Sequence, residues 1–235
     1  MKAMKKKFLL FDVDRTLLDF DRSEAEAIKN TLRHFGLPVT DEICERYPAI
    51  NESLWEEFEK GTIEKATILY RRFDILFSEF GISFDSKEFD AYYRTDLSRH
   101  AFLIPGAKEL LLSLKEKGYQ IHYVTNGTAG VQYPRLKNSG LDSLADGIFL
   151  SEEIGYQKPE KAFFDAVFPK IPDFTLEEAI IIGDSLSSDM KGGENVGLDT
   201  MWYNPKKVPN RLNLPVTYEV SDFSEIETIL DSMGG

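Results

Sequence analysis

The amino-acid sequence predicts an α/β protein, with a parallel β-sheet covered by helices on both faces and an all-helical block inserted near its start. First, Phe8 to Phe11 is a short apolar run typical of a strand buried on both faces. Second, strand and helix patterns alternate from Ile104 onward, as right-handed β-α-β crossovers require. Third, helical patterns follow one another from Leu18 to His100 without a convincing strand. We therefore expect a sheet core at residues 1–17 and 101–235, and a helical subdomain at 18–100.

The expected elements can be placed by their apolar spacing and by their breakers. In the helical block, Pro48, Gly61 and Gly81 are expected to separate the helices. Strands are expected at 8–11, 119–124, 147–150, 179–182 and 200–203, and helices at 21–35, 51–60, 62–80, 86–99, 105–118, 131–140, 159–168, 187–196 and 222–233.

Composition limits the possible partners and the compartment. The 40 acidic and 28 basic residues give a formal net charge of −12, which argues against binding to a nucleic acid polymer through a broad basic surface. The single cysteine, Cys44, excludes an internal disulfide and fits a reducing compartment. No stretch approaches the length of a membrane span. We expect a cytoplasmic protein without a membrane partner, either a monomer or a homodimer.

Polar side chains directly follow three of the expected strands. Asp12 and Asp14 come after the first, Thr125 and Asn126 after the second, and Asp184 after the strand at 179–182. The carboxyl ends of parallel strands meet at one edge of a sheet, which is where ligands bind in open α/β folds. For the Asp12–Asp14 pair alone, the alternative is a solvated turn. All three strand ends together predict a single site.

The residue types at this edge suit phosphoryl transfer. Asp12 is the candidate nucleophile, because a carboxylate can attack phosphorus and form an acyl-phosphate. Asp14 is the candidate acid and base, which would protonate the leaving oxygen and then deprotonate a water molecule. Asp184 adds an oxygen ligand for a hard divalent cation such as Mg²⁺.

Other residues are candidates for binding the phosphate or supporting the metal. The Thr125 hydroxyl and the backbone N–H of Asn126 could hold phosphate oxygens ahead of a helix. Lys158 could neutralise both the phosphate and Asp12, although a lysine taken alone is more often a solvated surface residue. Asp189 could support the metal site, or it could only stabilise the dipole of the helix that it begins.

Four short motifs together resemble those of the haloacid dehalogenase (HAD) superfamily. In chain order they are Asp12-Val13-Asp14-Arg15-Thr16, Val124-Thr125-Asn126-Gly127, Lys158-Pro159 and Gly183-Asp184-Ser185-Leu186-Ser187-Ser188-Asp189. The resemblance implies a Rossmann-like core with an inserted C1-type helical cap. It implies a Mg²⁺-dependent phosphatase in which Asp12 is both nucleophile and metal ligand. Asp14 would then be the acid/base, with its backbone carbonyl on the metal.

For the other motif residues, the resemblance implies phosphoryl binding by Thr125 and Lys158, Mg²⁺ binding by Asp184, and support of that site by Asp189. One position departs from the family pattern: Arg15 stands where the family usually has glycine. Arg15 must adopt an ordinary backbone conformation or tolerate strain. It could also mark a site that has lost catalysis.

A second set of residues resembles a subgroup of this superfamily: Tyr123 to Gly127, Gln132, Arg135-Leu136, Ser139-Gly140-Leu141 and Phe149 to Gly155. They are similar to the YjjG/YfnB-type pyrimidine 5′-nucleotidases, which implies a nucleoside monophosphate as substrate. Among the aromatic residues of the helical block, Phe20, in the loop after Asp12, is the candidate for a contact with substrate. The alternative is that Phe20 packs in the core. A sugar-phosphate phosphatase or phosphomutase on the same core remains an alternative. So does a retired module that binds phosphate without turnover.

Overall fold

The computed structural model describes residues 5–233, which form two compact units. The sheet unit comprises 5–19, 103–129 and 139–233, and the helical unit comprises 20–102 and 130–138. The outermost residues of the expected core, 1–4 and 234–235, lie outside the described residues. The segment 130–138 groups with the helical unit, a relation that no sequence pattern indicated.

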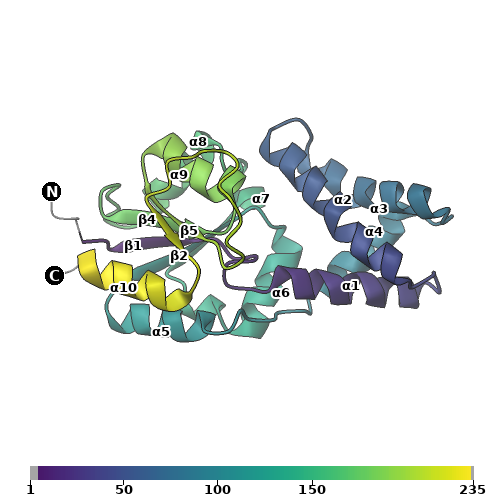
Figure 1. Ribbon diagram of the computed structural model, residues 1–235, viewed down its shortest axis with the longest axis horizontal. Coiled ribbons are helices and arrows are strands. Elements are labelled where there is room, and N and C mark those ends of the chain that lie inside the picture. Colours follow the sequence, from purple (N-terminus) through teal and green to yellow (C-terminus); the bar gives the residue numbers. More distant parts are fainter. Residues whose placement is uncertain (1–4, 234–235) are drawn as a thin grey trace. The chain divides into compact units, whose positions relative to one another are not determined.

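The sheet unit contains one six-stranded sheet in the order β3-β2-β1-β4-β5-β6, and every neighbouring pair is parallel (Figure 1). The strands are β1 (Phe8–Phe11), β2 (Gln120–Thr125), β3 (Gly147–Leu150), β4 (Ala179–Gly183), β5 (Asp199–Tyr203) and β6 (Tyr218–Val220). The predicted parallel sheet is confirmed, and β6 was not predicted. β1 lies inside the sheet, where Phe11 pairs with Tyr123 of β2 and with Ile182 of β4. This register brings the carboxyl ends of three strands level.

Helices cover both faces of this sheet (Figure 1). One face carries α5 (Ala107–Glu116) and α10 (Phe223–Met233), and the other carries α8 (Lys161–Val167) and α9 (Lys191–Val196). On the α8 face, Phe8 and Leu10 share a buried cluster with Phe163. The remaining elements are α6 (Ala129–Ser139), α7 (Ser151–Ile154), the 3₁₀ turns η1 (Asp142–Leu144) and η2 (Phe168–Lys170), and the π-helical turn η3 (Leu186–Met190). The single helix predicted at 187–196 is therefore η3 followed by α9.

The helical unit is built from α1 (Phe20–His34), α2 (Asp41–Glu59), α3 (Lys65–Phe80) and α4 (Ser86–Leu97). No strand occurs in this unit among the residues that the structure describes, as predicted. The prediction that Pro48 breaks the chain there is wrong, because α2 continues through it. The Thr40 hydroxyl accepts a hydrogen bond from the Ile43 N–H and caps α2, and burial of apolar side chains such as Leu54 on one face outweighs the bond that Pro48 cannot donate.

Between residues 5 and 233, no helix has both the length and the apolar character that crossing a membrane requires.

Candidate active site

The candidate site lies at the carboxyl edge of the sheet unit, where β1, β2 and β4 end. Asp12 directly follows β1, and its backbone N–H donates to the Ile182 carbonyl of β4 at 2.9 Å. Asp184 directly follows β4, and Thr125 is the last residue of β2. The parallel register thus brings together residues that are more than a hundred positions apart in the chain, as the strand-end pattern predicted.

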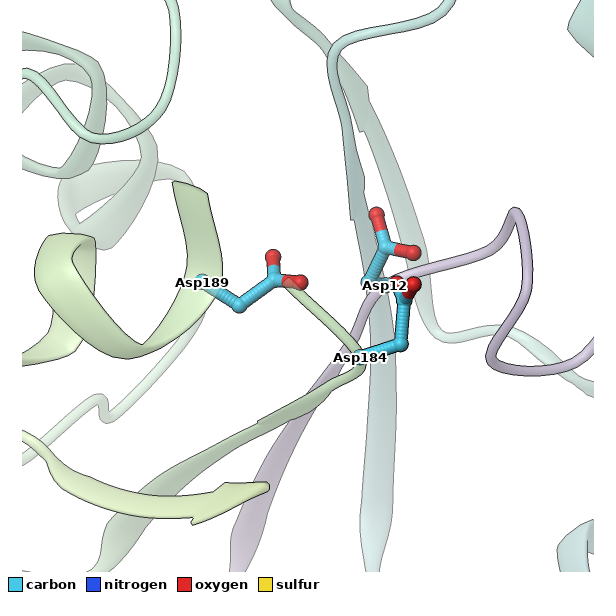
Figure 2. A group of neighbouring side chains, drawn as sticks. All are labelled: Asp12, Asp184 and Asp189. Carbon is cyan, nitrogen blue, oxygen red and sulfur yellow. The ribbon is translucent and has the colours of Figure 1, made fainter. Parts of the chain in front are cut away.

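Three carboxylates form the centre of this edge. Asp12, Asp184 and Asp189 each offer an oxygen atom, and these atoms all lie within 4.8 Å of one another. Figure 2 shows the three side chains beside one another, with Asp12 and Asp184 at the ends of their strands. Asp12 and Asp189 are buried, with 8% and 1% of their surface exposed. Such a set of oxygen donors fits a hard divalent cation such as Mg²⁺.

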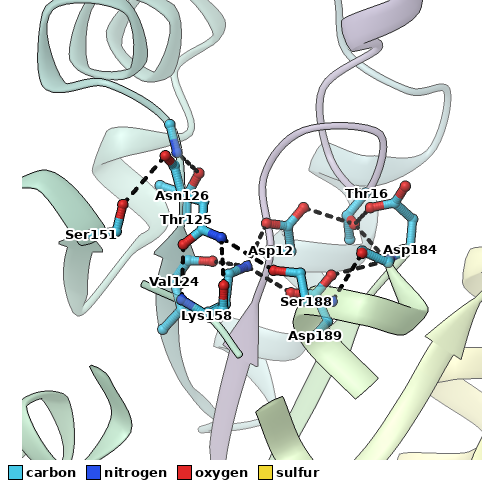
Figure 3. A network of polar contacts seen from close by, with 12 residues as sticks. Asp12, Thr16, Val124, Thr125, Asn126, Ser151, Lys158, Asp184, Ser188 and Asp189 are labelled. Carbon is cyan, nitrogen blue, oxygen red and sulfur yellow. Dashed lines mark hydrogen bonds and ion pairs between the residues drawn. The ribbon is translucent and has the colours of Figure 1, made fainter. Parts of the chain in front are cut away.

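Lys158 lies at the centre of the same group of side chains (Figure 3). Its Nζ donates to Asp12 Oδ1 at 2.8 Å, to Asp189 Oδ1 at 2.6 Å and to the Val124 carbonyl at 2.7 Å. Only 1% of the side chain is exposed, so the alternative of a solvated surface lysine does not apply. Asp189 likewise does more than begin a helix, because its carboxylate pairs with Lys158 and accepts the Ser185 N–H at 3.1 Å.

One lysine does not neutralise the three carboxylates of this cluster. Burial raises the pKa of Asp12 from 3.8 to about 7, although Lys158 opposes that shift. Burial also raises the pKa of Asp184 well above its ordinary value, and the neighbouring Asp12 and Asp189 charges add to the rise. Burial would lower the pKa of Lys158, but the two carboxylates beside it raise it overall. The carboxylate cluster therefore has excess negative charge, which a bound cation would relieve.

Asn126 fixes the backbone that carries Lys158. Its side-chain amide donates to the Lys158 carbonyl at 2.9 Å, and its Oδ1 accepts the Lys158 N–H at 3.0 Å. The same amide also donates to the Ser188 hydroxyl at 3.3 Å. The Asn126 side chain is thus occupied in positioning the lysine, and its predicted contact with phosphate would fall to its backbone N–H.

Thr16 is a site residue that sequence reasoning did not select, although it stands in the first motif. It is fully buried, and its hydroxyl donates to Asp12 Oδ2 at 3.2 Å. The same oxygen accepts the Asp184 N–H at 3.1 Å, so one hydroxyl joins the ends of β1 and β4. Trp202 of β5 was also missed; its indole N–H donates to the Asp184 carbonyl at 2.8 Å.

Gly183, the last residue of β4, leaves the space into which Asp189 fits. A Cβ atom added at this position would overlap the Asp189 carboxylate. Only glycine therefore allows the Asp189 side chain to reach both Lys158 and the Ser185 N–H. The close approach of Asp189 to Gly183 thus joins the carboxyl end of β4 to the carboxylate cluster.

The loop after Asp12 turns tightly at Arg15, whose φ is 61°. The backbone is thus left-handed at a residue other than glycine. Of the two possibilities for Arg15, an ordinary backbone conformation or strain, the structure shows strain. The Arg15 N–H donates to the Leu18 carbonyl at 2.7 Å. Asp14 pairs with Leu18 across this turn through a backbone bridge, and the Asp14 charge contributes to the raised pKa of Asp12.

Two further predicted site residues have different surroundings. Thr125 is buried, and its hydroxyl accepts the Gly127 N–H at 3.1 Å, which shapes the turn after β2. Phe20 is the first residue of α1 in the helical unit, where it packs against the apolar cluster and lies 5.6 Å from the Arg135 guanidinium. Its contact with a substrate stays a prediction.

Comparison with known proteins identifies the family. The model of the haloacid dehalogenase-like hydrolases matches residues 9–203. The chain is 40% identical over 223 residues to the HAD-hydrolase YfnB of Bacillus subtilis, which covers 95% of this chain and 94% of that protein. A crystal structure of YfnB bound to magnesium, which reveals interdomain movement, has a TM-score of 0.92 and covers 97% of this chain and 99% of that one.

Two further relatives carry names that state an activity. The pyrimidine 5′-nucleotidase PynA of Streptococcus pneumoniae is 37% identical over 225 residues, covering 96% of this chain and 95% of PynA. The pyrimidine 5′-nucleotidase YjjG of Escherichia coli is 27% identical over 227 residues, covering 97% of this chain and 99% of YjjG. With the four motifs placed at one sheet edge and these similarities along nearly the whole length, the chain is an enzyme that belongs to the haloacid dehalogenase-like hydrolases.

Proposed function

We propose that this enzyme is a Mg²⁺-dependent phosphatase that hydrolyses nucleoside monophosphates through a phosphorylated Asp12. The observation that carries the proposal is the position of the Asp12 carboxylate. One of its oxygens accepts from Lys158 and the other from Thr16, at the centre of an excess of negative charge. A nucleophilic carboxylate held in one orientation and next to a cationic group is what in-line attack on phosphorus needs.

The donor set fits the metal that the family implies. Asp12 and Asp184 would hold Mg²⁺ with their carboxylates, Asp14 would contribute its backbone carbonyl, and Asp189 would support the site. When bound, Mg²⁺ would supply positive charge that stabilises the phosphoryl group and keeps Asp12 ionised.

The protein residues then divide the reaction between them. An Asp12 oxygen forms a bond to phosphorus while the bond from phosphorus to the ester oxygen breaks, and Asp14 gives its proton to that leaving oxygen. Lys158 and the N–H groups after Thr125 hold the phosphoryl oxygens in place. Asp14 then takes a proton from water, whose oxygen attacks the phosphorus. The bond to Asp12 breaks, and inorganic phosphate is released.

The substrate class is inferred from the relatives. Two proteins that match nearly the full length of this chain are named pyrimidine 5′-nucleotidases. We infer a pyrimidine nucleoside monophosphate as the preferred substrate. The cytoplasm is the proposed compartment, because the one cysteine excludes an internal disulfide.

The test is release of inorganic phosphate from a panel of nucleoside monophosphates and sugar phosphates, with Mg²⁺ and with a chelator. We expect turnover only with Mg²⁺, with pyrimidine nucleotides preferred. Asp12→Asn should lower the rate by at least about a thousandfold while its circular dichroism spectrum stays unchanged. The exposed Asp165→Asn serves as a matched control and should keep full activity.

Preferred turnover of sugar phosphates would replace the substrate class and leave the chemistry in place. Undiminished turnover by Asp12→Asn would remove the mechanism. An absence of turnover on every phosphomonoester, with Mg²⁺ still bound, would instead indicate a retired site.

A further inference from the structure

Asp184 differs from the other two aspartates of the carboxylate cluster in how its side chain is held. Lys158 donates to Asp12 Oδ1 at 2.8 Å and to Asp189 Oδ1 at 2.6 Å, so each of these carboxylates has a short ionic partner. Among the residues that the structure describes, the Asp184 carboxylate has a single hydrogen bond, in which the Thr16 hydroxyl donates to its Oδ1 at 3.5 Å. A hydrogen bond of that length fixes a side chain only weakly. The orientation of this carboxylate therefore depends on the backbone that carries it.

The ladder of the sheet does not reach this part of the backbone. β4 ends at Gly183, which pairs with Trp202 of β5, and Asp184 is the first residue beyond the pairing. Both backbone polar groups of Asp184 bond to side chains instead. Its N–H donates to the Thr16 hydroxyl at 3.1 Å, and its carbonyl accepts the indole N–H of Trp202 at 2.8 Å. The two side chains come from opposite sides of β4, since Thr16 follows β1 and Trp202 belongs to β5.

Repulsion within the cluster gives these two bonds a task. An oxygen of Asp184 lies within 4.8 Å of oxygens of Asp12 and Asp189. Ionised carboxylates at this distance repel one another, so without a cation an unrestrained Asp184 would turn away from the other two. Thr16 restrains one side of Asp184, but its hydroxyl also serves Asp12.

Trp202 restrains the other side of Asp184, and its position makes that restraint effective. The indole N–H has one hydrogen to donate, and it donates to the Asp184 carbonyl. Only 2% of Trp202 is exposed, so water cannot take the place of the N–H at that carbonyl. A hydrogen bond shielded from water is stronger than the same bond at the surface.

We propose that Trp202 is a positioning residue of the metal site: its indole N–H holds the Asp184 backbone so that the carboxylate stays beside Asp12 before Mg²⁺ binds. This inference rests on the proposed role of Asp184 in binding Mg²⁺, and it deepens that role. A ligand that is already in place loses less conformational freedom when the ion arrives, so the hydrogen bond raises the affinity for Mg²⁺. Because Trp202 acts through Asp184, it should set this affinity and leave the reaction of the loaded enzyme almost unchanged.

The alternative is that the contact only satisfies a buried indole, since a buried tryptophan usually finds an acceptor for its N–H. Loss of the N–H would then lower stability without changing the affinity for Mg²⁺. The two explanations therefore predict different results when the N–H is removed.

The experiment removes the N–H in two ways. Trp202→Phe removes it together with part of the ring. Replacement of Trp202 by 3-benzothienylalanine removes the N–H alone, because sulfur takes its place in a ring of nearly the same shape. Met201→Val is the matched control: Met201 precedes Trp202 on β5 and is fully buried, so the change loses packing in the same strand and keeps the indole.

Three measurements are made on each protein. Calorimetric titration gives the affinity for Mg²⁺ without substrate, and thermal unfolding gives the stability. Phosphate release from the preferred phosphomonoester, measured over a range of Mg²⁺ concentrations, gives kcat and KM separately.

Both replacements of Trp202 should bind Mg²⁺ about tenfold more weakly than wild type, because the Asp184 carbonyl loses its donor and the carboxylate is no longer held in place. At saturating Mg²⁺, kcat and KM should stay within about twofold of wild type. Met201→Val should melt about 3 °C lower than wild type and bind Mg²⁺ with unchanged affinity.

Wild-type affinity for Mg²⁺ in the 3-benzothienylalanine protein would overturn the inference, and so would a fall in kcat that saturating Mg²⁺ does not restore. A wild-type protein that binds Mg²⁺ but turns over no phosphomonoester would count against the proposed function alone, because the calorimetric titrations still decide the role of Trp202. A wild-type protein that binds no Mg²⁺ would overturn both.

Discussion

Each unit of this protein contains a buried network of charged side chains, and the two networks differ in charge balance. In the helical unit, Arg72 donates to Asp90 Oδ1 at 2.7 Å and to Asn51 Oδ1 at 3.1 Å, and only 4% of its side chain is exposed. Asn51 in turn donates to Glu24 at 2.7 Å, and Arg94 pairs with the other oxygen of Asp90 at 2.7 Å. Two cations and two carboxylates thus share a connected set of hydrogen bonds.

In the sheet unit, three carboxylates lie close together and Lys158 bonds to two of them, and burial raises the pKa of both Asp12 and Asp184. Buried charges are tolerated when they are paired, as in the helical unit. A buried cluster of side chains that keeps excess charge needs a bound ligand of the opposite charge. Burial of charged side chains alone therefore does not indicate an active site. A buried cluster at a sheet edge whose positive and negative charges do not balance does indicate one.

The largest expected effect comes from filling the space beside Asp189. Gly183→Ala should lower phosphate release roughly a thousandfold, because the added methyl group displaces the Asp189 carboxylate and frees Lys158 from its position. Gly130→Ala is the matched control, since a Cβ atom at Gly130 meets nothing within 4 Å. Steady-state kinetics on both variants checks this. Near-normal activity in Gly183→Ala would show that Asp189 does not position the site.

Breaking the balanced network should affect stability rather than metal binding. Arg72→Met should lower the free energy of unfolding by about 3–5 kcal/mol, because it leaves the buried Asp90 carboxylate and the buried Asn51 Oδ1 with fewer partners. The neighbouring Arg71→Met removes an exposed pair with Glu57 and should cost less than about 1 kcal/mol. Urea unfolding gives both values. Mg²⁺ affinity should be unchanged in folded Arg72→Met, and a changed affinity would mean that the two networks are coupled.

The excess charge in the sheet unit predicts how Mg²⁺ stabilisation depends on pH. The pKa of Asp12 is about 7 in the folded protein and 3.8 in its ordinary state, so without metal the folded state favours the protonated carboxyl. Stability of the metal-free protein should therefore fall as pH rises through about 7, while Mg²⁺, which needs ionised ligands, stabilises more strongly at higher pH. Melting temperatures with and without Mg²⁺ between pH 5 and pH 8 should diverge as pH rises. A constant difference would contradict this account.

The smallest effect concerns His122 on β2, a buried group with no hydrogen-bond partner at either ring nitrogen. Burial lowers its pKa below 6.5, so the folded state favours the neutral ring. Its contribution to stability is present above 6.5 and is lost as the pH falls below that value. His122→Phe should flatten the decline of stability between pH 6.5 and pH 5, measured by chemical unfolding. An unchanged slope in His122→Phe would refute the assignment.

The sequence carried enough information to predict the sheet and the positions of the main site residues. Runs such as Ile180 to Ile182 have few other stable arrangements than a buried strand, and polar residues directly after them must lie at the carboxyl edge. Four short motifs in order also indicated the family. Lys158 was named from its place just before a predicted helix and again from the motifs, although a lysine taken alone is more often a solvated surface residue.

The remaining features depend on tertiary contacts that single-sequence patterns do not reveal. Pro48 lies inside α2 because buried side chains before and after it in the sequence, such as Tyr47 and Ile50, hold the helix in place. The three-residue strand β6 is too short to show a period. Thr16 and Trp202 act through hydrogen bonds to Asp184 that exist only once β4 is paired with β1 and with β5. The grouping of 130–138 with the helical unit likewise follows from packing.

The central claim, that Asp12 carries the phosphoryl group, can be tested most directly by rapid quenching in acid with a substrate labelled in its phosphate. Acyl-phosphates survive acid and are cleaved by hydroxylamine, so the labelled peptide can be isolated and sequenced. The account predicts label on the peptide containing Asp12, released by hydroxylamine and absent from Asp12→Asn. Turnover without any label on the protein, or with label on a residue other than Asp12, would contradict it.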